Sequence, residues 1–190
     1  RGLMDGAHLT GGFADPARDG ARAFRAALEA MARPGRIERI AGAVPPAPLS
    51  PAAGALVLVL CDRTTPLHLA GAHDSEAVRT WITFHTGAPF SAPAEASFAL
   101  GRWADLGPLS AYPQGTAAYP DRSATLIVEV DRLAAEGPRL TGPGIETEAR
   151  LTLPETEAFR ANAGAFPLGL DFYFTAGDAL AALPRTTRVG

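Results

Sequence analysis

One stretch decides the fold: Phe166-Pro-Leu-Gly-Leu-Asp-Phe-Tyr-Phe-Thr-Ala-Gly-Asp-Ala-Leu-Ala-Ala-Leu-Pro-Arg-Thr-Thr-Arg-Val189. Apolar and polar residues alternate from Leu170 to Thr175, as they do in a β-strand with one face turned to a core. Ala176-Gly177 interrupts this alternation, and an apolar strand resumes from Ala179 to Leu183. The stretch therefore predicts a β-hairpin, which Pro184 ends because proline has no N–H to donate.

The tail after the hairpin is a candidate ligand edge. A two-residue turn flanked by Thr175 and Asp178 would place Leu168 roughly opposite Arg185, so the tail would lie beside the turn that follows Phe166. A guanidinium and hydroxyls suit a phosphate or phosphonate, which charge-assisted hydrogen bonds hold. An edge strand whose arginine is solvated remains an equal alternative. The candidate edge consists of Arg185, Thr186 and Thr187.

Two further features belong to the candidate site. Asp171 lies within a predicted strand, where aspartate is disfavoured, so we expect it to have a buried donor as partner rather than a ligand. The turn from Thr141 through Gly142 to Gly144 could expose backbone N–H groups to an anion. A purely structural turn is the favoured alternative, because Pro143 removes one of those donors.

Metal and nucleophilic chemistry find no support. The three histidines of the central region do not have the close spacing of a metal site. His85 ends an apolar helical stripe, so a hydrogen-bonded core role is favoured over its role as a ligand residue. Cys61 lies in an apolar segment, where a thiol stays protonated and inert. We therefore predict no catalytic residue.

Composition limits the class of protein. The 190 residues are 47% hydrophobic and 19% charged, which fits one globular domain. A net charge of -3 does not favour nucleic acid or an anionic membrane as partner. The apolar run from Ala52 to Cys61 is shorter than the roughly 20 residues that cross a bilayer. With one cysteine and no leader pattern at the start, the sequence favours the cytoplasm.

All 17 basic residues are arginine, and the sequence contains no lysine. Without an ε-amine, the chain cannot form an internal Schiff base with pyridoxal phosphate. It also lacks the lysine of a P-loop. We therefore expect no cofactor on this chain.

The remaining pattern predicts a three-layer αβα domain of α/β class around a mixed sheet, spanning residues 15–190 after a flexible segment 1–14. A helix from Asp15-Pro16 to Ala32 is expected to bury Phe24, Leu28 and Met31. A second helix is expected over Pro51–Cys61, with a strand as the alternative. A third is expected over Ser75–His85, with Asp74 as its N-cap. A fourth is expected to begin at a capping box of Thr152 and Glu155 and to end at Gly164. The expected further strands are 36–41, 66–70, 124–130 and 139–141, with strand edges near Phe90 and Phe98 and a helical turn within 103–110.

Several motifs together resemble the PhnH family, the H subunit of the bacterial carbon–phosphorus lyase core complex. The chain ends in Phe-Pro-Leu-Gly-Leu-Asp, followed about a dozen residues later by Pro-Arg-Thr-Thr. Similar motifs occur in the same order upstream: Phe24-Arg25, Met31-Ala-Arg-Pro-Gly35, Phe84-His-Thr86 and Leu140-Thr-Gly-Pro-Gly-Ile145. The sequence departs from the family at Arg188, where a histidine is expected.

The resemblance implies a large domain of the pyridoxal-phosphate transferases, truncated and without cofactor. It also implies a complex with the G, I and J subunits, in which alkylphosphonate displaces adenine from ATP to give ribose 1-phosphonate 5-triphosphate. The iron–sulfur chemistry of the J subunit then breaks the carbon–phosphorus bond. This chain would be an accessory subunit, a subunit that contacts substrate or, least favoured, a free-standing binder. We expect the isolated chain to form a homodimer.

Overall fold

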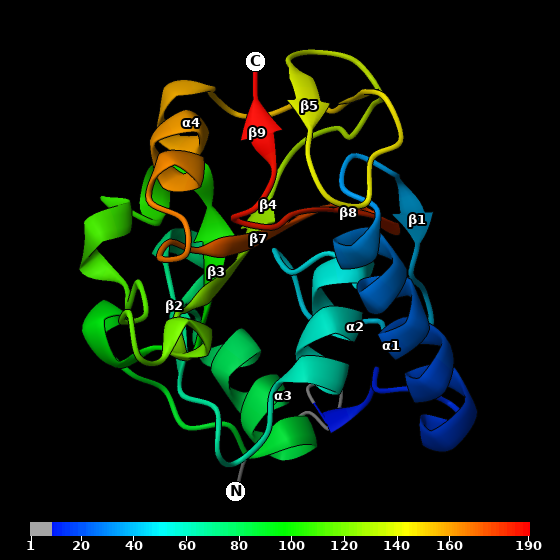
Figure 1. The fold of residues 1–190 in the computed structure, drawn as a ribbon. Helices are drawn as coiled ribbons and strands as arrows, with labels where there is room; N and C mark the ends of the chain where they lie inside the picture. Colours follow the sequence, from blue (N-terminus) through cyan, green and yellow to red (C-terminus); the bar gives the residue numbers. More distant parts are fainter. Residues whose placement is uncertain (1–8) are drawn as a thin grey trace, which may run out of the picture.

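The computed structural model describes residues 9–190, which form an α/β fold around a mixed six-stranded sheet (Figure 1). The sheet order is β1 (Glu38–Arg39), β8 (Ala179–Leu183), β7 (Asp171–Ala176), β4 (Thr125–Glu129), β3 (Phe98–Arg102) and β2 (Leu67–Leu69). Strands β2, β3, β4 and β7 are parallel, whereas β8 and β1 are antiparallel to their neighbours. The predicted α/β class and mixed sheet are confirmed.

The C-terminal hairpin forms, but its turn is displaced from the predicted one. Ala176 pairs with Ala179, so Gly177 and Asp178 make the turn. Gly177 adopts a φ of 59°, which glycine reaches without steric cost and which lets the strand continue through Ala176. Arg185 therefore lies near Leu170 rather than opposite Leu168. The predicted register is wrong by two residues, a shift that keeps every side chain on its expected face.

Three helices cover one face of the sheet: α1 (Pro16–Ala32), α2 (Pro51–Leu60) and α3 (Glu76–Thr86) (Figure 1). The predicted helix after Pro51 is confirmed, with Ser50 as the N-cap, and its strand alternative is wrong. The N-cap of α3 is Ser75 rather than Asp74, whose carboxylate instead pairs with Arg79. Gly87 ends α3 in the left-handed conformation, as its sequence position predicts.

Helix α1 buries a different stripe from the one we expected. Ala23, Ala27 and Ala30 face the core, whereas Phe24 is 45% and Leu28 is 54% exposed. Of the expected stripe, Met31 alone packs against the core, and it is partly buried. Small alanine side chains let the helix backbone approach closely, and the hydroxyl of Tyr173 on β7 reaches the carbonyl oxygen of Ala27 at 3.2 Å. The prediction rested on hydrophobicity and therefore placed the larger side chains in the core. Close packing of the helix against the sheet instead favours the small alanines.

The other face is covered by α4 (Glu157–Gly164), by 3-10 turns and by a small sheet of order β6 (Ala149–Arg150), β5 (Arg139–Thr141) and β9 (Arg188–Val189) (Figure 1). This layer is therefore not purely helical, as the αβα prediction required. The 3-10 turns are η2 (Gly71–His73), η3 (Pro93–Glu95), η4 (Trp103–Asp105), η5 (Leu109–Ala111) and η6 (Pro120–Arg122). The turn expected within 103–110 forms as η4 and η5.

The start of α4 corrects a second capping prediction. Its N-cap is Thr156, and Thr152 instead donates its hydroxyl to the carbonyl oxygen of Arg132. Glu155 accepts a hydrogen bond from the Ala158 N–H, so only this half of the expected capping box faces the helix.

The N-terminal segment is attached to the first face where the structure describes it. The carbonyl oxygen of Thr10 accepts a hydrogen bond from the Trp81 indole at 2.9 Å, and that of Gly11 accepts one from the Val44 N–H at 2.8 Å. These hydrogen bonds connect Thr10 and Gly11 to the first face, residues 1–8 lie outside the described part, and the flexibility of residues 1–14 stays a prediction. Within residues 9–190, none of the helices has the length and apolarity to cross a membrane.

Candidate functional site

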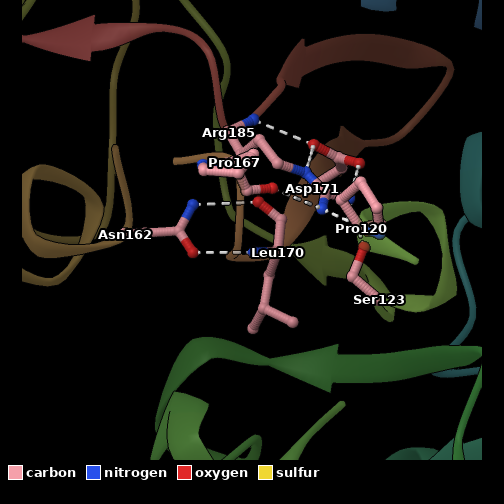
Figure 2. Close-up of polar contacts among 7 residues, drawn as sticks. All are labelled: Pro120, Ser123, Asn162, Pro167, Leu170, Asp171 and Arg185. Carbon is pink, nitrogen blue, oxygen red and sulfur yellow. Dashed lines mark hydrogen bonds and ion pairs between the residues drawn. The ribbon is translucent and has the colours of Figure 1, made fainter. Parts of the chain in front are cut away.

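The predicted ligand edge is built around an ion pair at the amino end of β7 (Figure 2). One carboxylate oxygen of Asp171 accepts hydrogen bonds from the backbone N of Arg185 at 2.9 Å and from its Nε at 3.2 Å. The other carboxylate oxygen accepts from Nη2 at 2.6 Å. This bidentate geometry gives Asp171 the donor partner that its position in a strand predicted.

The remaining donors of Arg185 are also used within the chain. Nη1 donates to the carbonyl oxygen of Pro120 at 2.7 Å and lies 3.4 Å from that of Pro167, and Nη2 donates to Ser123 Oγ (Figure 2). All five N–H groups of the guanidinium therefore have protein partners. The side chain is only 12% exposed, so the solvated-edge alternative is wrong. Arg185 is held as a clamp that joins three segments.

Asn162 on α4 ties the neighbouring turn to the same place. Its Oδ1 accepts from the backbone N of Leu170 at 2.8 Å, and its Nδ2 donates to the carbonyl oxygen of Leu170 at 2.9 Å (Figure 2). We did not predict this residue from the sequence. The available signal was its position three residues after Phe159, on the inward face of a short amphipathic helix.

A cavity of about 340 Å³ lies beside this clamp, between the glycine turn and the C-terminal tail. Its lining brings together Gly142, Arg185 and Thr186, which were predicted for the site, with Pro143, Ala163, Phe166 and Arg188, which were not. The glycine turn and the C-terminal tail come together because Thr141 on β5 pairs with Arg188 on β9. The side chain of Arg188 is exposed and makes no hydrogen bond or ion pair with the residues that the structure describes. It is the cation at this cavity that remains available to an anion.

The two glycines of the turn are required for packing. A Cβ on Gly142 would lie 2.9 Å from the carbonyl oxygen of Thr186, and one on Gly144 would lie 2.0 Å from that of Ala32. Both residues also have positive φ, of 132° and 82°. These contacts favour the structural reading of the turn, which brings the tail close enough to form the cavity.

Thr187 is 1% exposed, and its hydroxyl has no hydrogen-bond partner within residues 9–190. A buried hydroxyl without a hydrogen-bond partner destabilises the fold, so Thr187 departs from the pairing expected of buried polar groups. Thr186 is half-buried and lines the cavity directly.

His85 is not brought to this site. It lies on α3, on the other face of the sheet, with Nε2 at 3.4 Å from the carbonyl oxygen of Thr10 and its ring 4.9 Å from that of Trp81. Cys61 is buried, and burial raises the pKa of its thiol to about 12, which keeps it protonated as predicted. No group of three metal-binding side chains occurs among the described residues.

Comparison with known proteins covers almost all of the chain. The model of a family described as bacterial phosphonate metabolism protein (PhnH) matches residues 11–190. The PhnH subunit of alpha-D-ribose 1-methylphosphonate 5-triphosphate synthase from Rhizobium meliloti (strain 1021) is 40% identical over 191 residues, which cover 95% of this chain and 94% of that protein. A putative C-P lyase subunit protein, HtxG, from Stutzerimonas stutzeri is 33% identical over 182 residues, covering 88% and 84%.

Proposed function

The chain belongs to the PhnH family of bacterial phosphonate metabolism proteins, and from this premise we propose that it is a subunit of a ribose 1-methylphosphonate 5-triphosphate synthase. The observation that carries the proposal is the 40% identity over 95% of the chain to a subunit of that name. The decisive test is growth on methylphosphonate as sole phosphorus source by a host whose own PhnH gene is deleted. Expression of this chain should restore growth there, and failure by a chain that is expressed and folded would contradict the proposal.

We propose that the partners are the G, I and J subunits of the carbon–phosphorus lyase core complex. The complex would displace adenine from ATP with alkylphosphonate, and this chain would not perform the chemistry. In support, the C-terminal site offers a cation, hydroxyls and turn backbone, but no nucleophile beside a base. Co-purification with tagged partner subunits from a phosphate-starved host tests the assembly.

Within the complex, we propose that Arg188 and Thr186 contact an anionic group, either of the substrate or of a partner carboxylate. Arg188 is preferred to Arg185 because every donor of Arg185 already has a partner, whereas Arg188 is exposed at the same cavity. Arg188 occupies the position where the family resemblance leads us to expect histidine, so this chain has a permanently charged side chain there. A partner contact and a substrate contact are distinguished by whether Arg188→Ala abolishes co-purification or only activity.

We also propose that the isolated chain forms a homodimer through its exposed apolar surface. Phe24 and Leu28 lie one turn apart on α1, and both are about half exposed. Sedimentation velocity at micromolar concentration should give a dimer for the native chain and a monomer for Leu28→Glu. A monomer for the native chain would contradict the proposal, and a dimer that persists in Leu28→Glu would place the interface elsewhere.

The fold, we propose, derives from the large domain of a pyridoxal-phosphate transferase that has lost its cofactor. The mixed sheet and the absence of lysine from the sequence support this origin. Incubation with pyridoxal phosphate and borohydride should leave the internal residues unmodified by mass spectrometry, once the N-terminal amine is excluded.

A further inference from the structure

A second polar cluster lies at the opposite end of the sheet from Arg185. Glu129 is the last residue of β4, faces Thr175 of β7 in the parallel register, and is only 6% exposed. Its Oε2 accepts from Thr175 Oγ1 at 3.1 Å, and its Oε1 accepts from the backbone N of Ser50 at 2.7 Å. Ser50 is the N-cap of α2, so the carboxylate lies at the positive end of the helix dipole.

The cluster contains a histidine whose hydrogen-bonding groups are not satisfied. His73 ends η2, is 2% exposed, and places Nε2 3.7 Å from Glu129 Oε1, beyond hydrogen-bond length. Neither ring nitrogen has a hydrogen-bond partner within residues 9–190. A buried imidazole in that state opposes folding, so its retention beside a buried carboxylate is explained more readily by function than by stability.

Glu129 opens onto a cleft of about 590 Å³ at the carboxyl ends of β3 and β4. Ligands of open α/β sheets commonly bind outside the carboxyl ends of the parallel strands. The cleft has this position, because Arg102 and Glu129 are the last residues of the parallel strands β3 and β4 and both line it. The residues relevant to binding are Arg102, Trp103, Asp105, Glu129, Asp131 and Arg132.

The charges of the cleft indicate what it would bind. Arg102 pairs with Asp131, and Arg132 pairs with Glu136, so both guanidiniums are already engaged. The Asp105 side chain forms no hydrogen bond or ion pair with any described residue, and it acts on Arg102 only through its charge: the pKa of that guanidinium is raised chiefly by the hydrogen bond to Asp131 and also by Asp105. The Asp105 carboxylate lies close to Gly71, two residues before His73, because a Cβ on Gly71 would be 2.3 Å from Asp105 Oδ2. The groups left available to a ligand are therefore carboxylate acceptors.

Acceptors require a ligand that donates hydrogen bonds, and two classes qualify. These are an ammonium group and a neutral vicinal diol, whereas three carboxylates disfavour a phosphoryl group. The proposed function points to the diol, because the product named for the relative contains ribose and a diol donates two hydrogen bonds. In dinucleotide-binding folds, a carboxylate near the ends of the parallel strands binds the ribose hydroxyls by this chemistry.

We propose that this cleft binds the ribosyl part of a substrate, with Asp105 and Glu129 accepting hydrogen bonds from its diol and Trp103 lining the apolar side. The proposal rests on the proposed function, in which the product contains ribose. His73 does not line the cleft itself and is a positioning residue behind Glu129.

The test uses the full chain and two sugars, methyl β-D-ribofuranoside and its 2,3-dideoxy counterpart, titrated by ¹H–¹⁵N NMR. The chain has two tryptophans: Trp103 lines the cleft, and Trp81 donates to Thr10 on the other face, so the second indole is an internal control. We expect the riboside to shift the Trp103 indole saturably, the Trp81 indole to stay unchanged, and the dideoxy sugar to bind at least tenfold more weakly.

Two variants complete the test. Asp105→Ala removes an exposed carboxylate outside any hydrogen-bond network, so it should fold and should weaken riboside binding at least tenfold; Glu95→Gln, an exposed carboxylate elsewhere, should leave binding unchanged. A missing Trp103 response, equal binding of both sugars, or full binding by Asp105→Ala would each overturn the proposal. Should binding fail while the chain still restores growth on methylphosphonate, the subunit function stands and this site does not.

Discussion

Each end of the central sheet holds a carboxylate in a polar cluster, part-buried at Asp171 and buried at Glu129, and the two clusters differ in how many of their hydrogen-bonding groups have partners. At the amino end of β7, Asp171 meets a guanidinium whose five donors all have protein partners. At the carboxyl end of β4, Glu129 accepts two hydrogen bonds and faces a histidine with none. The same sheet thus carries a closed network at one end and an open one at the other.

The difference separates structural from functional use of buried charge. A network in which every donor is paired contributes to stability and leaves nothing to offer a ligand. A cluster with unpaired groups opposes folding, and such departures from internal consistency concentrate at functional sites. The residues that sequence motifs emphasised lie mainly at the closed end, so their emphasis reflects folding at least as much as binding.

The largest expected effect comes from opening the closed end. Arg185→Ala leaves the part-buried Asp171 carboxylate without its cation, so we expect the free energy of unfolding to fall by about 3 kcal/mol in urea denaturation. Arg79→Ala breaks an exposed pair with Asp74 and should cost about 0.5 kcal/mol or less. Equal, small losses in both variants would show that the network is not the clamp described here.

A smaller loss is expected from Asn162→Ala, which removes the side chain that satisfies both backbone groups of Leu170. These groups are buried, so we expect a loss of about 2 kcal/mol in the same assay. Glu157→Ala on the same helix removes a side chain that is 86% exposed and should change stability by no more than about 0.5 kcal/mol. A loss for Asn162→Ala no larger than this control would contradict the tether.

At the open end, removing a buried polar side chain should leave the free energy of unfolding unchanged or raise it. His73→Leu replaces an unsatisfied buried imidazole by an apolar side chain, so stability should stay unchanged or rise by up to about 1 kcal/mol. The matched control is His68→Leu, which removes a ring nitrogen that lies 3.1 Å from the carbonyl oxygen of Ser91 and should cost about 1 kcal/mol. A marked loss for His73→Leu would mean that its contact with Glu129 stabilises the fold.

The smallest effect on stability belongs to Arg188. The side chain is exposed and without a partner among the described residues, so Arg188→Ala should shift unfolding by no more than about 0.5 kcal/mol. Growth on methylphosphonate should nevertheless be impaired, whereas Arg18→Ala, an exposed arginine on α1, should leave growth normal. Normal growth of the Arg188 variant would remove it from the proposed contact.

Local signals in the sequence located most elements but misjudged details that depend on packing. Alternation placed the strands of the hairpin, yet the turn lies one residue later than predicted and the strand pairing shifts by two, because Gly177 rather than Ala176 takes the positive φ. Proline after an N-cap placed α1 and α2, yet the inward stripe of α1 consists of alanines. For α1, a neighbouring element that no local window contains decided the outcome.

The sequence by itself determined the α/β class, the family and the lack of lysine, because periodicity, capping residues and motif order are local properties. Only the tertiary structure decided what the polar residues do. Arg185 is engaged by Ser123 and Pro120, which lie 62 and 65 positions earlier, and Glu129 meets Ser50 across 79 positions. Partners at such separations are set by how the strands and helices pack, so no spacing along the chain distinguishes the closed network from the open one.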